Sequence, residues 1–507
     1  MVFNHPVPLA LLVLVVVFLP LSILFKSLPR KQYLPLPPGP PHIPVLGNLH
    51  QQSWSQPWKT YQEWHQQYGP IVYFKIGPYQ TISLGNHHVA KDLLEKRGAI
   101  YSSRPKSLWS ECMTKGLQPV FQSYASSSWK LIQKLQVPLL TNTAIRAYLP
   151  LLDLETRKLL IDLLLPQFVS VPATRFAFSM ASNLLTGERV PSGIEASIHD
   201  FRHVIDGFFR DIHWTYFLLD LVPGMKYMPS WMIKFKQVSH AFYSSTTKIF
   251  DETFGRAVNS TRWTFTRAFM YHRESLKVTW EQICFALGEL WTAMSVTTPA
   301  TLLVFTRLSI LNPEKFQKLQ QEIDSIVGPD RLPSPEDVDR VVYLKAFVME
   351  VLRLDTLIPL GFLRSVGKDN EYMGYRIPAN IIIVPNTWCL DHDESIYQQP
   401  YKFLPERWLD DPNLPLGAFG FGRRKCPGRH LALRSLHLAI ARIAWAFDVY
   451  WPEDPVPTTP KYRGFILVPR DFLGVFRPRS LRHKQVINEE WDNGMHLADA
   501  FTGLDLP

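Results

Sequence analysis

A single cysteine near the C-terminal end of the chain lies among residues that could hold a flat, metal-bearing ligand. The run 419–428, Phe-Gly-Phe-Gly-Arg-Arg-Lys-Cys-Pro-Gly, contains three glycines, three consecutive cations and Cys426. A helix is predicted to follow, and Pro427 suits its first turn because the amide proton that proline lacks would have no partner there. The dipole and free N–H groups of a helix N-terminus stabilise a thiolate. The helix is indicated by apolar residues at spacings of three and four: Leu433, Leu436, Ile440, Ile443 and Phe447.

Taken alone, one cysteine is most often a small buried hydrophobe. The surrounding pattern favours another interpretation, because the glycines let a planar group approach and a thiolate can be the axial ligand of haem iron. Phe-x-x-Gly-x-Arg-x-Cys-x-Gly, with every fixed position filled here, resembles the haem-binding loop of the cytochrome P450 family. The resemblance implies haem b with the Cys426 thiolate on its iron, and it assigns further contacts with the haem to Phe419, Arg424 and Gly428.

A long apolar stretch, 280–311, carries a second set of candidates. A membrane span would have this length, but a buried central helix has it too, and the motif content favours the helix. Residues 293–298 are similar to the family's Ala-Gly-x-Asp/Glu-Thr-Thr/Ser segment, which lies over the haem. The resemblance makes Thr297 and Thr298 the catalytic candidates. It also places three residues in the substrate pocket: Ala293, Met294 and Val296.

Two positions of this segment depart from the family pattern. Met294 replaces the glycine that permits a local helix distortion, and Val296 replaces the acid that relays protons, which a valine cannot do. Pro299 cannot donate to the carbonyl of Ser295, so we expect it to open the helix near Thr297. Protons would then travel through Thr297 with water, or come from a substrate hydroxyl.

A third set predicts a structural support for the cysteine loop. Glu350 and Arg353, three residues apart, share one helix face, and such a pair alone is usually solvated. Arg407 follows shortly before the loop. In the family, an equivalent Arg joins the Glu-x-x-Arg pair in a buried network, so we expect a structural rather than a catalytic role for all three.

The resemblance also suggests partners for the haem edge and the substrate. Trp129 and Lys130 match a family Trp-Arg pair whose cation meets a haem propionate. Lys130 offers a single ammonium charge in place of the guanidinium group of Arg, which can donate two parallel hydrogen bonds. Arg364 is a second candidate propionate partner. Leu360 and Phe362 occupy the family's substrate-facing strand after the Glu-x-x-Arg helix.

Composition narrows the class of protein. Lys and Arg (54) exceed Asp and Glu (44), which gives a net charge of +10 and suggests an acidic partner or an anionic membrane. No long basic run or nucleic-acid module is present, so nucleic acid is not predicted as a partner. The four cysteines show no disulfide or zinc spacing, which indicates a reduced, cytosol-facing chain.

The N-terminal region predicts a membrane anchor. Residues 7–25 are apolar and as a helix would span about 28 Å, close to the bilayer core. Lys26, Arg30 and Lys31 follow the span, so the positive-inside rule places the N-terminus in the lumen and the body in the cytosol. A cleaved signal peptide fits less well, because no charged segment or clear cleavage site is present. A single-pass protein of the endoplasmic reticulum membrane is therefore expected.

The predicted organisation has four parts: an anchor (1–30), a proline-rich hinge (31–50), a haem-thiolate catalytic domain (51–482) and an acidic, flexible tail (483–507). The hinge is expected to be a stiff extended arm between membrane and globule. Strands are predicted at 71–76 and 81–84, as a hairpin, and helical periodicity dominates from about residue 89. The fold class is mainly α with small β-sheets, the cytochrome P450 fold, preceded by one transmembrane helix.

The predicted function is that of a fungal-type microsomal monooxygenase that hydroxylates or epoxidises an apolar small molecule, such as a terpenoid of secondary metabolism. The chain has no dinucleotide-binding fingerprint, so electrons from NADPH would come through a separate diflavin reductase, with cytochrome b5 as a further candidate partner. Arg423, Arg424, Lys425 and Arg429 would give the reductase a basic docking surface. Val296 keeps two alternatives open: an isomerase or dehydratase that needs no NADPH, or a catalytically impaired haem protein.

Overall fold

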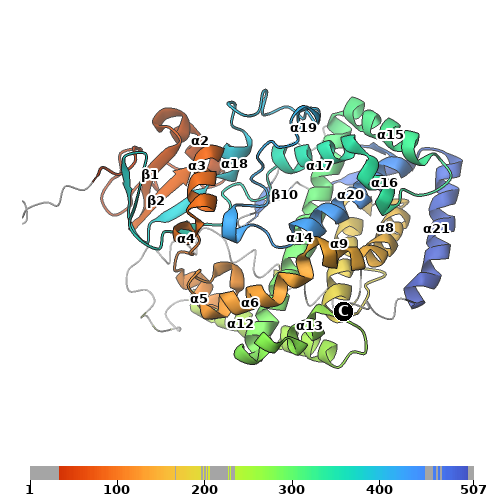
Figure 1. The fold of residues 1–507 in the computed structure, drawn as a ribbon, viewed down its shortest axis with the longest axis horizontal. Helices are drawn as coiled ribbons and strands as arrows, with labels where there is room; N and C mark the ends of the chain where they lie inside the picture. The colour runs from red at the N-terminus through yellow and green to blue at the C-terminus, as the bar shows by residue number, and fades with distance from the viewer. Residues whose placement is uncertain are drawn as a thin grey trace, which may run out of the picture.

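The computed structural model of the chain is mainly helical, with four small sheets (Figure 1). It describes residues 34–500 except for 166, most of 194–233, 452–460, 464–465 and 469–470. The predicted anchor at 7–25 lies outside the described residues. The helices before the central one are α2 (Pro57–Tyr68), α3 (His87–Ala90), α4 (Gly98–Tyr101), α5 (Leu108–Thr114), α6 (Ser127–Gln136), α7 (Asn142–Ala147), α8 (Leu149–Leu163), α9 (Ser170–Thr186), α12 (Lys234–Val258) and α13 (Phe265–Tyr271).

The second half of the chain adds the central helix and those packed around it. They are α14 (Trp280–Leu311), α15 (Pro313–Val327), α16 (Pro335–Arg340), α17 (Val342–Leu354), α18 (Thr387–Asp391), α19 (Arg407–Asp410), α20 (Arg429–Ala446) and α21 (Leu481–Ala500). Short 3₁₀ or π turns are η1 (Lys91–Lys96), η2 (Pro119–Phe121), η3 (Pro138–Leu140), η6 (Arg273–Lys277) and η7 (Gly422–Arg424).

The largest sheet has the order β1-β2-β7-β4 and lies at one end of the molecule, on the left of Figure 1. Its hairpin of β1 (Ile71–Ile76) and β2 (Tyr79–Leu84) confirms the predicted one. β7 (Ile382–Pro385) runs parallel to β2, and β4 (Arg364–Ser365) pairs with β7. The smaller sheets join β5 (Asn370–Tyr372) to β6 (Tyr375–Ile377), β9 (Lys461–Arg463) to β10 (Ile466–Val468), and β3 (Gln167–Phe168) and β8 (Phe447–Tyr450) to β11 (Leu473–Pro478).

Helix α14 is the predicted central helix, with the predicted bounds. It starts at a capping box in which Thr279 and Gln282 satisfy each other's backbone N–H groups. It packs against α9, α12, α17 and α20. Of the described helices it alone is long and apolar enough to cross a membrane, but 67% of its apolar window is buried inside the protein. It therefore serves here as the core helix.

Pro299 does not interrupt α14, contrary to our expectation. The helix is α-helical without a break from Trp280 to Leu311. Two threonines bond back to the preceding turn: Thr297 Oγ1 donates to the Ala293 carbonyl at 2.9 Å, and Thr301 Oγ1 donates to the Thr297 carbonyl at 2.9 Å. Both hydroxyls stay bonded within the helix, and the backbone remains α-helical across the proline although one backbone donor is missing.

The helix that follows the cysteine loop begins two residues later than predicted. α20 starts at Arg429, so Pro427 lies in the turn before it, and Phe447 opens strand β8 instead of closing the helix. The rest of the predicted apolar face is present, and Leu436, Ile440 and Ile443 are buried. Cys426 therefore precedes the helix N-terminus by three residues.

The proline-rich segment lies on the body and does not stand apart from it as an arm. The Tyr73 N–H donates to the Pro38 carbonyl at 2.9 Å, and the Arg376 N–H donates to the Pro35 carbonyl at 2.8 Å. A Cβ on Gly39 would meet the Tyr73 carbonyl oxygen at 1.8 Å, so the close approach requires glycine. Residues 34–41 are thus docked beside β1.

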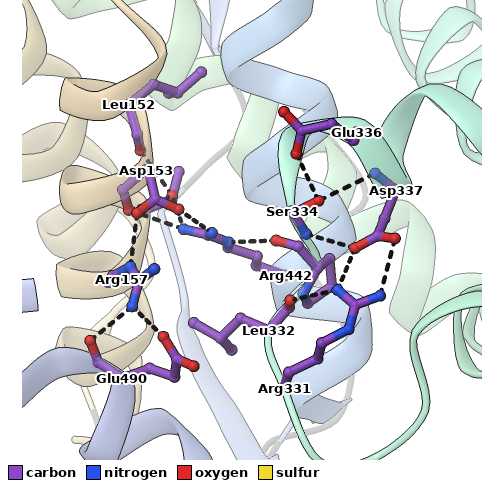
Figure 2. Close-up of polar contacts among 12 residues, drawn as sticks. Leu152, Asp153, Arg157, Arg331, Leu332, Ser334, Glu336, Asp337, Arg442 and Glu490 are labelled. Atoms are coloured by element: carbon purple, nitrogen blue, oxygen red, sulfur yellow. Dashed lines mark hydrogen bonds and ion pairs between the residues drawn. The ribbon is translucent and has the colours of Figure 1, made fainter. Parts of the chain in front are cut away.

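From Leu481 to Ala500 the acidic C-terminal region is a packed helix, not the flexible tail that the sequence predicts, and 501–507 lie outside the described residues. α21 packs along α8, and its Val486 and Ile487 are each only 1% exposed. In Figure 2, the Arg157 guanidinium joins Glu490 of α21 to Asp153 of α8. Glu490, one of the charges that made this region look solvated, is thus an ion-pair partner of α8 on an amphipathic helix.

One buried guanidinium ties α8 to α20. Arg442, 1% exposed, is paired with Asp153 (Figure 2). It also donates to the Thr156 hydroxyl at 2.6 Å and to the Pro333 carbonyl at 3.0 Å. The network in Figure 2 therefore fixes α20, the helix that follows the cysteine loop, against α8, and Arg157 links α8 in turn to α21.

Removing α21 should destabilise the catalytic body. Full burial of one Val or Ile side chain contributes about 1.5–3 kcal/mol. A chain that ends at Ser480 is thus expected to lose about 3 kcal/mol or more of unfolding free energy, measured by urea denaturation. A chain that ends at Ala500 is the matched control and should unfold like the full chain. Equal stability of both truncations would contradict a structural role for α21.

Candidate active site

The loop around Cys426 is held in a tight, glycine-dependent conformation. The Cys426 N–H donates to the Phe419 carbonyl at 2.8 Å, and the Gly420 N–H donates to the Gly417 carbonyl at 2.8 Å. Gly420 and Gly422 have φ values of 69° and 54°, in the left-handed region that favours glycine. A Cβ on Gly422 would lie 2.2 Å from the Leu94 carbonyl oxygen. The two glycines therefore let the loop return on itself and press against η1.

The last glycine of the loop leaves open space beside the sulfur. A Cβ on Gly428 would have only the Cys426 Sγ within 4 Å, at 4.0 Å. Burial raises the pKa of the Cys426 thiol, and the N–H groups of Gly428 and Arg429 oppose that rise. A metal ion deprotonates a coordinating thiol outright, so the thiolate that the sequence predicts is the form a bound iron would select.

Three buried arginines converge, and the carboxyl group of Glu289 is close enough to two of them, Arg104 and Arg424, to act on their charges. We call Arg104, Arg364 and Arg424 the arginine cradle. Burial lowers the pKa of Arg364 to about 10 and that of Arg424 to about 10, and the charge of Arg424 adds to the effect on Arg364. The pKa of Arg104 is also well below its usual value, because of burial and the two neighbouring cations. Among the described residues, none of the three forms an ion pair with a carboxylate.

Each guanidinium of the cradle is held by backbone carbonyls. Arg364 donates to the Phe421 carbonyl at 2.6 Å, which brings it to the cysteine loop, and Arg424 donates to the Ser102 carbonyl at 2.9 Å. Arg104 donates to the Phe362 carbonyl at 3.0 Å. Buried charges need a countercharge, so this cradle suits an anionic group. The sequence offered no motif for Arg104, which only the fold brings to the other two.

The predicted Trp129–Lys130 pair divides into a buried and an exposed residue. The guanidinium of Arg424 lies over the Trp129 ring, 4.1 Å from its centroid, so Trp129 joins the cradle through a cation–π contact. Lys130, the next residue on α6, is exposed. The other lysine of that helix, Lys134, lies 3.6 Å from Glu274. Contact of Lys130 with a propionate stays a prediction.

Glu350, Arg353 and Arg407 come together as expected. Arg353 donates to both carboxylate oxygens of Glu350 at 2.8 Å, and Arg407 donates to Oε1 at 3.2 Å. Glu350 and Arg353 are 0% exposed. Trp408 Nε1 adds a bond to Glu350 Oε2 at 2.9 Å, and the Leu404 N–H adds one to Oε1 at 3.0 Å. Trp408 directly follows Arg407 in the chain, but no motif marked it as a partner of Glu350.

A further buried acid, Asp391, connects this network to the cysteine loop. Arg353 donates to the Asp391 carbonyl at 2.7 Å, and the Gly417 N–H donates to Asp391 Oδ1 at 2.7 Å. Thr356 Oγ1 donates to Asp391 Oδ2 at 3.1 Å, and His87 Nε2 lies 3.4 Å from Oδ1. Since Gly417 lies two residues before Phe419, the network fixes the point where the loop begins. Asp391 carried no recognisable motif.

The predicted distal residues form the exposed part of an otherwise buried helix. Ala293 is exposed and Met294, Val296, Thr297 and Thr298 are half-buried, whereas the turns of α14 before and after them are buried. Side chains that are only partly buried halfway along a core helix indicate that there is space beside the helix at that point. The five residues therefore lie along a partly open face of α14, and their place in a substrate pocket stays a prediction.

An apolar cluster, which we call the apolar wall, borders this space. It contains Val296 of α14 together with residues of α5, η2, α12 and β10. Leu357 and Ile358 belong to it, whereas the predicted Leu360 packs with a different cluster, at β1 and α2. Residues 357–363 form turns, and the strand begins only at Arg364, so the predicted strand is displaced. The members of the wall are Trp109, Cys112, Met113, Phe121, Ile205, Phe235, Phe242, Val296, Leu357, Ile358 and Ile466.

Phe362, the other predicted pocket residue, lies at the arginine cradle. The Arg104 guanidinium is 5.6 Å from the centroid of its ring and bonds its carbonyl. A thiol with open space beside it, buried arginines without an ion pair among the described residues and an apolar wall together suit a flat ligand that carries two carboxylates and a metal. Haem b has those properties, with Cys426 as the axial ligand and the cradle for its propionates. The site therefore defines a haem-thiolate protein.

Comparison with known proteins identifies the family. The profile of the cytochrome P450 family matches residues 37–473. The cytochrome P450 monooxygenase drtD of Aspergillus calidoustus is 35% identical over 464 residues, which cover 90% of this chain and 88% of that protein. The cytochrome P450 monooxygenase aneD of Aspergillus aculeatus is 34% identical over 499 residues, 96% of each chain. The chain belongs to the cytochrome P450 family and is an enzyme of its monooxygenase class.

Proposed function

We propose that the protein is a membrane-anchored monooxygenase that hydroxylates or epoxidises an apolar small molecule of fungal secondary metabolism, with terpenoids as the first class to test. The observation that carries this proposal is the exposed stretch of α14 beside the apolar wall. That space accepts an apolar substrate next to Thr297. With substrate bound, its apolar lining would keep water away, which protects a reactive oxygen from side reactions.

When bound, haem would supply the activation of O₂, one atom of which enters the substrate while the other becomes water. Cys426 would hold and tune the iron, and the arginine cradle would orient the propionates. The Thr297 hydroxyl donates a hydrogen bond to the Ala293 carbonyl. The lone pairs of its Oγ1 are therefore free to accept a hydrogen bond and to orient a water or a substrate hydroxyl. Thr297 therefore holds the proton donor in place instead of being the acid itself.

The electrons would come from a separate NADPH-dependent diflavin reductase on the endoplasmic reticulum membrane. Arg423 and Lys425 are exposed on the cysteine loop and can meet an acidic partner, whereas Arg424 is turned inward to Trp129. The test is co-expression with such a reductase and comparison of oxygenated metabolites against a strain without the P450. The absence of any reductase-dependent product or NADPH oxidation across a broad substrate set would contradict the proposal.

Val296 motivates one rival function. It is packed in the apolar wall and offers no proton, which would suit an isomerase or dehydratase that rearranges an already oxygenated substrate. Turnover of such a substrate without reductase or NADPH would favour the rival. Turnover only with both would favour the monooxygenase.

Introducing an acid at position 296 should raise the amount of product formed per NADPH consumed. In Val296→Asp, a carboxyl group near Thr297 can deliver protons, so product formed per NADPH consumed is expected to rise by about twofold or more. Substrate should bind more weakly, because a polar group enters an apolar wall. Val296→Asn is the matched control, with the same size but no acid, and should leave the ratio unchanged. An unchanged ratio in both variants would show that proton delivery does not limit this enzyme.

A further inference from the structure

Glu289 is a carboxylic acid of the central helix that the chemistry above does not use. It lies one helical turn before Ala293, on the face of α14 that leads to Val296 and Thr297. Its Oε2 accepts the backbone N–H of Val120 at 2.8 Å, a contact between positions 169 residues apart. The side chain of Gln118 also bonds it. Glu289 thus attaches the turn η2 to the core helix.

The arginine cradle holds the same turn from its other side. Arg104 Nε donates to the Val120 carbonyl at 2.7 Å, and Arg424 donates to the Gln122 carbonyl at 2.5 Å. The N–H of Val120 is thus bound by an acid and its carbonyl by a cation. Burial raises the pKa of Glu289 to about 7, while the Val120 N–H and the charges of Arg424 and Arg104 oppose that rise. The position of η2 is therefore set by a few buried polar bonds.

The turn carries one aromatic residue of the substrate space. Phe121 packs edge-on against Trp109, with ring centroids 5.5 Å apart, and both belong to the apolar wall together with Val296. The residue before Phe121 is Val120, which Glu289 holds. A shift of η2 would therefore move the Phe121 ring relative to Val296 and change the shape of the space between them.

We propose that Glu289 is a positioning residue for substrate, because its bond to Val120 fixes the Phe121 ring as one side of the substrate pocket. The proposal rests on the proposed function, since it assumes that the substrate occupies the space beside the apolar wall. Glu289 contacts no substrate in this proposal and acts through the backbone of η2. Loss of its acceptor should weaken the binding of ligands that reach Phe121 and spare those that do not.

Two azole probes test this on the full-length holoprotein. Both imidazole and 4-phenylimidazole can ligate haem iron, but only the second carries an aromatic ring into the apolar space. Their dissociation constants follow from the change in haem absorbance. In Glu289→Ala, the affinity for 4-phenylimidazole is expected to fall about tenfold, while the affinity for imidazole and the haem content stay within twofold of the unmodified protein. Phe121→Ala should show the same selective loss.

Two further variants separate positioning from general damage. Glu289→Gln keeps an oxygen acceptor for the Val120 N–H and should bind 4-phenylimidazole within threefold of the unmodified protein. Glu281→Gln changes the other acid of α14, which bonds Tyr243 and not η2, and should have no effect. The double variant Glu289→Ala/Phe121→Ala should lose no more affinity than either single variant, because both remove the same contact.

The outcomes distinguish this inference from the proposed function. Unchanged 4-phenylimidazole affinity in Glu289→Ala, or fully additive losses in the double variant, would overturn the inference alone. If Glu289→Ala does not fold, unchanged affinity in Phe121→Ala overturns it equally. An unmodified protein that binds neither azole would overturn the haem-based function and the inference with it.

Discussion

Replacing Cys426 with serine is expected to abolish both the thiolate-type carbonyl difference spectrum and reductase-dependent turnover. Loss of a group that only orients a metal ligand already costs about 10–100-fold in affinity or activity. Cys426 is the ligand itself, and serine offers a hard, hardly acidic oxygen in place of a soft thiolate. We therefore expect a loss of activity greater than about 100-fold, together with a reduced haem content.

The other cysteines provide matched controls. Cys284 and Cys389 are buried, and burial raises the pKa of both thiols, so neither is poised as a thiolate. Cys284→Ser should keep the carbonyl spectrum and lose only some stability, because a hydroxyl replaces a sulfur in an apolar core. A Cys426→Ser protein with a normal thiolate spectrum would refute the assignment of the axial ligand. The same spectral loss in Cys284→Ser would indicate general unfolding instead.

Sequence reasoning succeeded where the chemistry is encoded in short motifs. The cysteine loop is specified by closely spaced glycines with defined φ values, and Glu350 and Arg353 share a helix face by spacing alone. Arg407 could be added because it precedes the loop in the chain. The long helix 280–311 was likewise predictable, because a strongly apolar run of this length, with Glu281 and Glu289 as its only acids, needs burial along most of its surface.

Sequence reasoning failed where residues that are distant in the chain come together only in the folded protein. Arg104 lies more than 250 residues from Arg364 and more than 300 from Arg424 in the chain, and no local pattern marks it as a member of the cradle. The C-terminal helix α21 was mistaken for a flexible tail because its charges outweighed two apolar positions, Val486 and Ile487, which proved to be its buried face. Tertiary contacts in both cases override local composition.

The largest loss of stability is expected from Arg353→Met. The Arg353 side chain is 0% exposed and donates to Glu350, to the Asp391 carbonyl and, at 3.4 Å, to the Lys402 carbonyl. Methionine fills much of the volume but leaves a buried carboxylate with fewer partners. Breaking a buried ion pair in this way costs about 3–5 kcal/mol. The check is the unfolding free energy and the rate of haem loss at fixed temperature.

An exposed ion pair of similar geometry shows whether burial is the cause. Arg434 on α20 lies 2.6 Å from Asp339, with both side chains partly exposed, so Arg434→Met should cost about 0–1 kcal/mol. The two variants should also differ in how they affect haem binding. Because Arg353 reaches the Cys426 loop through Asp391 and Gly417, its loss should speed haem dissociation before global unfolding, whereas Arg434→Met should leave that rate unchanged. Equal effects of the two variants would mean that the buried network contributes stability without fixing the loop.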